Sequence, residues 1–124
     1  SIKLSELAIG IGPFVVGPAV QRKIGLSAMS ELAIDATQWR SANWAQNKGL
    51  YSDVSESCEK MDEKINELLQ KLALSNPDAM CELKKIFWTG TEDWDTLLIE
   101  RAEISGRLVL SDFTRNAIHA FKKK

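Results

Sequence analysis

The chain has 124 residues, of which 44% are hydrophobic and 27% charged, a balance typical of one small folded domain. Its formal net charge of -1 leaves no broad basic surface to attract nucleic acid, so we expect no nucleic-acid partner. One histidine and two cysteines outside any CxxC pair argue against a zinc site.

The first residues predict a strand end followed by a turn. Ser1 to Leu4 has the character of a strand, and Glu6 follows it, where catalytic side chains are commonly presented to a cleft. The uncharged run 7–20 is too short to span a bilayer and is broken by glycine and proline, so we expect no membrane partner. The predicted strand has no clear partner in the chain, and the first residue is not Met. We therefore expect the chain to be a piece of a longer protein, or to have a partner that supplies the rest of the sheet.

Short helices fill the region up to residue 54. Pro18 suits the first turn of a helix, Gly25 suits a left-handed stop, and Ser41 suits an N-cap. We expect helices over 18–24, 28–34 and 42–48, and a short strand or an extended link over 50–54.

Longer amphipathic helices follow. Apolar residues recur at spacings of four, three and four between 57 and 74, and Pro77 begins the next helix, which runs to about Trp88. Further helices are expected over 94–109 and from Ser111 or Asp112 to the end. Both cysteines, Cys58 and Cys81, fall on apolar helix faces. Buried free thiols are therefore expected, and they favour a reducing, cytoplasmic location.

Three stretches, taken in order, resemble the C-terminal half of the crotonase (enoyl-CoA hydratase/isomerase) family. The first is Glu-Leu-Ala-Ile-Gly-Ile-Gly-Pro at 6–13, a glutamate, three apolar residues, a glycine, two further residues and a proline. The second is Ser-Ala-x-x-Ala-x-x-x-Gly-Leu at 41–50. The third is Ala-Phe at 120–121 with Lys124 three residues later.

The resemblance implies a mostly α chain, the C-terminal helical part of a ClpP/crotonase-like α/β fold with a short N-terminal strand left from its sheet. Residues 1–55 would be the end of the core with the catalytic-glutamate turn. Residues 56–124 would be a helical oligomerisation region of the same continuous unit. Relatives use these helices to build trimers, so the implied assembly is a homotrimer or a dimer of trimers.

The implied activity is addition of water to an α,β-unsaturated acyl-CoA thioester through a stabilised enolate. Glu6 would be the catalytic acid/base, since hydration needs groups that activate water and deliver a proton to carbon. Gly10, Pro13 and Phe14 would line the substrate pocket. The resemblance implies no tightly bound cofactor and no metal, because coenzyme A enters as part of the substrate. In relatives the residues matching Phe121 and Lys124 touch the nucleotide end of coenzyme A.

The sequence departs from the family pattern where it matters for chemistry. Phe14 stands where many hydratases have glycine, and it would reshape the acyl pocket or block a backbone contact to water. The family half that carries a second glutamate and the oxyanion hole does not precede Glu6, so the chain alone is expected to be inactive. Two alternatives stay open: an isomerase or other CoA-thioester enolate enzyme of the family, and a non-catalytic helical oligomerisation fragment.

Overall fold

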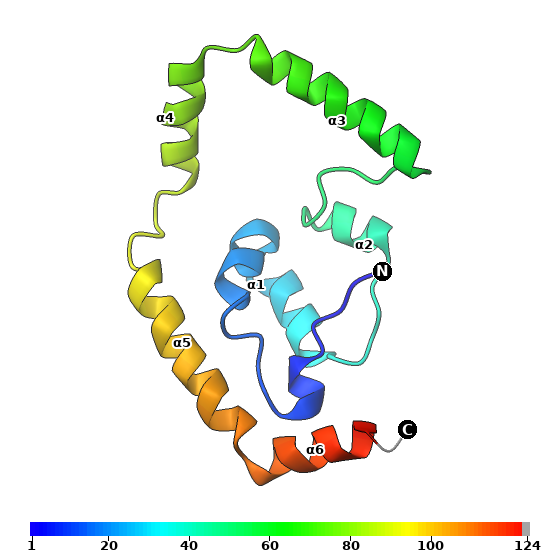
Figure 1. Ribbon diagram of the computed structural model, residues 1–124, viewed down its shortest axis with the longest axis vertical. Helices are drawn as coiled ribbons and strands as arrows, with labels where there is room; N and C mark the ends of the chain where they lie inside the picture. Colours follow the sequence, from blue (N-terminus) through cyan, green and yellow to red (C-terminus); the bar gives the residue numbers. More distant parts are fainter. Residues whose placement is uncertain (123–124) are drawn as a thin grey trace. The chain divides into compact units, whose positions relative to one another are not determined.

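The computed structural model describes residues 1–122, and helix dominates them (Figure 1). This confirms the predicted mostly α class. The chain divides into two compact units, the first made of residues 1–52 and 95–124 and the second of residues 53–94. The elements in chain order are η1 (Glu6–Ile9), α1 (Gly17–Ile34), α2 (Ala42–Asn47), α3 (Cys58–Ala73), α4 (Pro77–Phe87), α5 (Trp94–Val109) and α6 (Asp112–Lys122).

The predicted N-terminal strand is reduced to a single antiparallel bridge between Ile2 and Arg40. The Ile2 N–H donates to the Arg40 carbonyl at 2.9 Å, and the Arg40 N–H donates to the Ile2 carbonyl at 2.8 Å. The partner that the sequence pattern did not reveal is therefore the backbone just before α2. Within the first unit, the bridge holds the segment before η1 against the segment before α2.

Helix α1 changes direction at Gly25. This residue has φ 77° and ψ 165°, which lie outside the helical region, so α1 consists of two helical segments joined there. The predicted stop at Gly25 is confirmed, because a residue without a side chain adopts positive φ at little cost. The second segment carries much of the buried core of the unit, which consists of Ala28, Met29, Leu32, Ala36 and Ala45.

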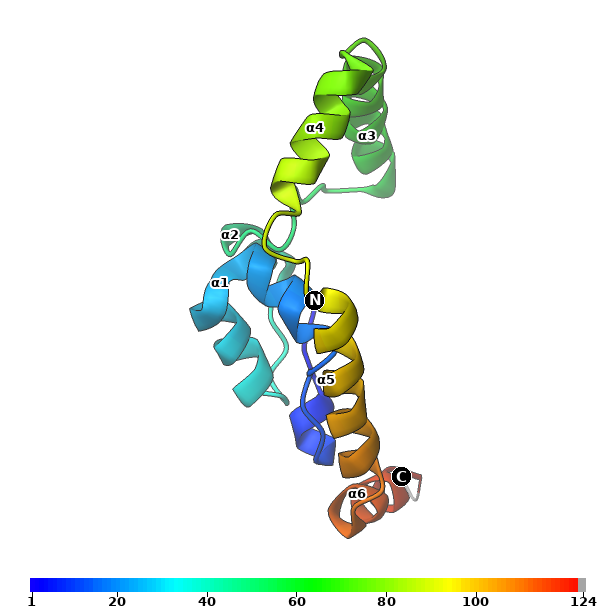
Figure 2. The same ribbon diagram turned by 90° about the vertical axis from the view of Figure 1, so that its left-hand side faces the viewer.

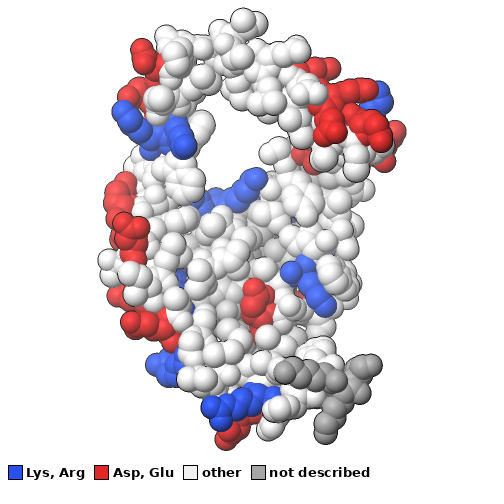
Figure 3. Space-filling view, in the orientation of Figure 1, with Lys and Arg blue, Asp and Glu red and all other residues white. Residues whose placement is uncertain are grey.

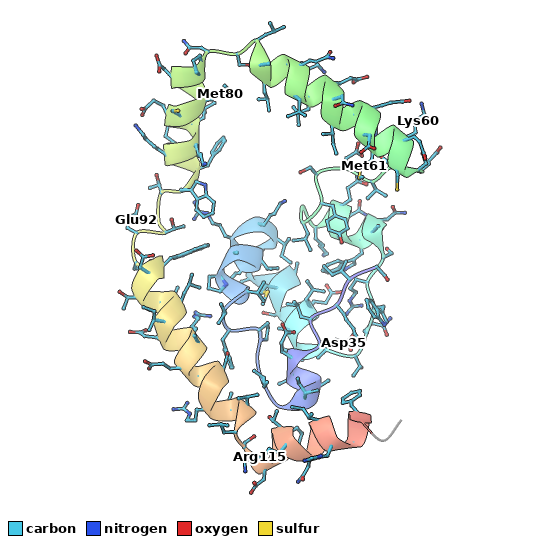
Figure 4. The ribbon with its side chains drawn as sticks, viewed as in Figure 1. Asp35, Lys60, Met61, Met80, Glu92 and Arg115 are labelled. Carbon is cyan, nitrogen blue, oxygen red and sulfur yellow. The ribbon has the colours of Figure 1, made fainter. Side chains whose placement is uncertain are left out.

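The Arg40 side chain interacts with both the end of α1 and the start of α2. Its Nη2 atom lies 2.9 Å from Asp35 Oδ2 and 3.3 Å from Glu31 Oε1, and its guanidinium lies 5.8 Å from the centre of the Trp44 ring. The predicted cap at Ser41 is confirmed, since its Oγ accepts a hydrogen bond from the Trp44 N–H at 3.0 Å. Asp35, at the end of α1, is labelled in Figure 4.

The second unit contains α3 and α4, which begin close to the predicted positions, each after a side chain that caps it. Ser57 Oγ accepts from the Lys60 N–H at 3.3 Å, and Asn76 Oδ1 accepts from the Asp78 N–H at 2.9 Å just before Pro77 begins α4. Residues 50–54 form a link rather than a strand. Met61 and Met80 mark the two helices in Figure 4.

Neither α3 nor α4 buries a residue, although both are strongly amphipathic. The prediction of buried thiols is wrong, because Cys58 and Cys81 are exposed. Periodicity identifies an apolar face, but it does not say whether another element covers that face. The large apolar residues exposed on these two helices are Met61, Ile65, Leu68, Leu69, Leu72, Leu83, Ile86 and Phe87.

Helices α5 and α6 close the first unit. Ser111 caps α6, because its Oγ accepts from the Thr114 N–H at 3.3 Å. Helix α5 contains the acidic residues Asp95, Glu100 and Glu103, and acidic side chains gather on the left-hand side of the space-filling view, over the region of α5 (Figure 3). In two views at right angles, η1 lies beside α6 (Figures 1 and 2), and η1 contacts both α6 and α1.

We expect Arg40→Ala to lower the free energy of unfolding of the first unit by about 1–2 kcal/mol, since partly exposed ion pairs and one cation–π contact are lost together. Hydrogen exchange of the slowest α1 amides measures the change. Lys85→Ala is the matched control, because it removes an exposed pair with Glu82 in the second unit. Equal α1 exchange in the two variants would contradict the role given to Arg40.

The pKa of Glu59 lies below its ordinary value because the Ser57 side chain, first, and the Glu59 backbone N–H, second, hydrogen-bond its carboxylate. A lowered pKa stabilises the folded α3 end above the ordinary pKa, and this contribution is lost as the pH falls through the folded value. We expect Ser57→Ala to raise the Glu59 pKa toward its ordinary value in a carboxyl NMR titration. Ser75→Ala, at the far end of α3, should leave that titration unchanged.

Candidate functional site

The turn that carries Glu6 is fixed by its own backbone. Gly10 ends η1 with φ 84°, a left-handed conformation that favours glycine. The Gly10 N–H donates to the Leu7 carbonyl at 3.1 Å, and the Ile11 N–H donates to the Glu6 carbonyl at 2.9 Å. The backbone of Glu6 is therefore held by hydrogen bonds from the residues immediately after the turn.

Glu6 lines an open pocket of about 290 Å³. Its Oε2 atom is buried and has no hydrogen-bond partner among the described residues. A buried carboxylate oxygen without a donor is costly and uncommon, so this atom is suited to accept a hydrogen bond from a water molecule or from a donor group of a ligand. The other lining residues are Ile11, Gly12, Pro13, Phe14, Val15, Val16 and Ser105.

Ser105 brings the second polar side chain to this pocket, and it comes from α5. Its hydroxyl donates to the Arg101 carbonyl at 3.2 Å, so its oxygen presents lone pairs to its other neighbours. Sequence reasoning did not select Ser105 as a site residue. The helix 94–109 that bears Ser105 was predicted, but the sequence did not show that Ser105 faces Glu6.

Phe14 folds back over the turn. Its backbone N–H donates to the Gly12 carbonyl at 2.8 Å, and a Cβ placed on Gly12 would lie 2.5 Å from the Phe14 Cζ atom. The phenylalanine ring therefore covers Gly12 at the pocket wall, and the N–H of residue 14 is already engaged. Pro13 lines the same pocket, and its carbonyl accepts from the Gly17 N–H at 2.8 Å where α1 begins.

The other residues that the sequence analysis selected for the site do not line the Glu6 pocket in the described structure. Gly10 lies against the first turn of α6, where a Cβ would be 2.8 Å from Thr114 Oγ1. Phe121, also on α6, is 64% exposed, so its ring is open to a ligand or a partner. Lys124 lies outside the described residues.

Other site types have little support in the described part of the chain. Residues 1–122 contain no group of three or more His, Cys, Asp or Glu side chains arranged to hold a metal ion. Among the same residues, no helix is both long enough and apolar enough to cross a membrane. The Glu6 pocket is the candidate site because it holds a buried carboxylate oxygen that has no hydrogen-bond partner among the described residues.

The fold is similar to that of a known enzyme. The crystal structure of an enoyl-CoA hydratase from Mycobacterium avium matches this chain with a TM-score of 0.85 and 23% sequence identity. The match covers 96% of this chain and 46% of that one, so the chain spans about half of the hydratase's length. No protein-family model and no curated protein matches the sequence. The likeness shows the fold, that of the helical C-terminal part of such an enzyme.

Proposed function

We propose that the chain is the C-terminal part of an enoyl-CoA hydratase-like enzyme, which adds water across an α,β-unsaturated acyl-CoA thioester. The observation that carries the proposal is the Glu6 carboxylate, whose Oε2 atom is buried without a partner at an otherwise largely apolar pocket. A positioned carboxylate of this kind serves as a general acid or base. The structural likeness to an enoyl-CoA hydratase supports the same choice of chemistry.

The proposed enzyme needs groups that the described residues do not supply. Enolate formation requires donors aimed at the thioester oxygen, and in the resembling family these donors and a second glutamate precede the Glu6 motif. The structural match covers 46% of the hydratase chain, which agrees with a site shared with another segment. We therefore propose that the 124-residue chain has no hydratase activity by itself.

Coenzyme A would be held as part of the substrate. Phe121 is exposed on α6 and is available to stack on a nucleotide base, and Lys124 would place a cation near phosphate. The region 56–124 would build a homotrimer or a dimer of trimers. The exposed apolar residues of α3 and α4 support a role in assembly, since large exposed apolar patches mark interaction surfaces.

We expect Glu6→Gln, in the protein that contains the complete site, to lower kcat with a short enoyl-CoA by at least about 100-fold, because glutamine cannot exchange a proton. The affinity for coenzyme A should change little. Stopped-flow absorbance of the enoyl thioester and equilibrium binding of coenzyme A measure the two effects.

Glu103→Gln is the matched control, since it makes the same change on α5 outside the pocket lining. The unmodified 124-residue chain is the negative control. An unchanged turnover in Glu6→Gln would remove Glu6 from the mechanism. It would also leave the non-catalytic oligomerisation fragment, which the exposed faces of α3 and α4 favour, as the better account.

A second candidate, an isomerase that moves the double bond of an enoyl-CoA, is favoured by Phe14. The N–H of residue 14 is engaged by the Gly12 carbonyl, so it offers no hydrogen bond to an attacking water. Moving a double bond needs one group to take and return a proton, which a single carboxylate can do. Hydration needs an activated water as well.

We expect Phe14→Gly to raise the ratio of hydration to isomerisation by at least about tenfold. Glycine removes the ring that covers Gly12, and its backbone is free enough to release the residue 14 N–H from the Gly12 carbonyl. Both products are measured by chromatography of reactions with 3-enoyl-CoA and 2-enoyl-CoA substrates. Phe14→Leu keeps a bulky side chain and serves as the control. A ratio that rises equally in both variants would show that ring volume, not the N–H, sets the outcome.

A further inference from the structure

The first turn of α6 packs against the end of the turn that carries Glu6. A Cβ placed on Gly10 would meet Phe113 Cδ1 first, and it would lie 2.8 Å from Thr114 Oγ1 and 3.0 Å from Phe113 Cε1. Both distances are shorter than ordinary van der Waals contact, so the side chains of α6 lie directly against the Gly10 backbone. The close approach explains why η1 and α6 are in contact although they are far apart in the sequence.

Thr114 is the better anchored of the two α6 residues at this contact. It is 0% exposed, whereas Phe113 is 66% exposed. The Ser111 hydroxyl donates to Thr114 Oγ1 at 3.2 Å, which satisfies a polar group that would be costly to bury alone. The Thr114 side chain is thus fixed both by burial and by the cap of its own helix.

The contact is connected to the Glu6 carboxylate through two backbone hydrogen bonds. Gly10 and Ile11 donate to the carbonyls of Leu7 and Glu6, so a shift of Gly10 shifts the residue that bears the acid. The same stretch of chain also supplies Ser105 to the pocket from α5, nine positions before Thr114. One continuous segment therefore supports the Glu6 turn and lines the pocket that Glu6 faces.

We propose that Thr114 is a positioning residue for Glu6, and that the docking of α6 on Gly10 sets where the carboxylate lies in its pocket. The proposal rests on the proposed function, in which Glu6 transfers the proton. It makes the C-terminal helix a condition for catalysis in addition to any part that helix plays in binding coenzyme A. Loss of the contact would disorder the acid without removing the pocket.

The first test uses hydrogen exchange of the 124-residue chain. Thr114→Ala should speed exchange of the Gly10 and Ile11 amides by about tenfold or more, because the η1 turn loses its support. Thr114→Ser, which keeps the hydroxyl, should restore most of the protection. Arg115→Ala is the matched control, since Arg115 is an exposed residue on the same turn (Figure 4). The slowest α1 amides report global unfolding of the first unit and should not change.

The second test measures turnover in the protein that contains the complete site. Thr114→Ala should lower kcat by about tenfold with little change in KM, and Thr114→Ser should recover most of the loss. Unchanged exchange at Gly10 and Ile11, or faster exchange with unchanged kcat, would overturn the positioning role. The proposed function fails by a different result, an unchanged kcat in Glu6→Gln, so the two failures can be told apart.

Discussion

The conformation of Gly10 is the constraint on which the arrangement around Glu6 depends. Positive φ costs an L-residue about 1–2 kcal/mol, and here a side chain would also overlap the atoms of α6. The two restrictions act at one position and for different reasons. The positive φ of Gly10 lets η1 end sharply after Ile9, and the absence of a side chain on Gly10 lets α6 pack against that end. Gly10, which is one of the fixed positions in the motif at 6–13, is therefore also the residue against which α6 packs.

Local signals explain which parts of the fold were predictable. Ser41, Ser57 and Pro77 mark helix starts because a cap or a proline acts within one turn of its own position. Gly25 marks a break for a similar reason, since its positive φ needs no distant partner. Each of these features is decided by neighbours in the chain, so the sequence alone was enough to place them.

The features that could not be predicted depend on which elements meet. Ser105 and Thr114 look ordinary in their helices, and their importance comes from facing the Glu6 pocket and Gly10, respectively. The prediction that Cys58 and Cys81 are buried failed for the complementary reason. Their helices were correctly predicted as amphipathic, but the apolar faces of α3 and α4 remain exposed among the described residues. Periodicity gives a face its character, whereas tertiary or quaternary contact decides its burial.

The chemistry of the site follows from how its polar groups are already used. Phe14 donates its N–H to Gly12, Ser105 donates its hydroxyl to Arg101, and the turn amides donate to carbonyls. Each of these donors is engaged, while Glu6 Oε2 has no donor. The pocket therefore presents an acceptor without a matching protein donor in the described chain. Such an imbalance is relieved by a donor that arrives from outside the described chain, with water or with a bound ligand.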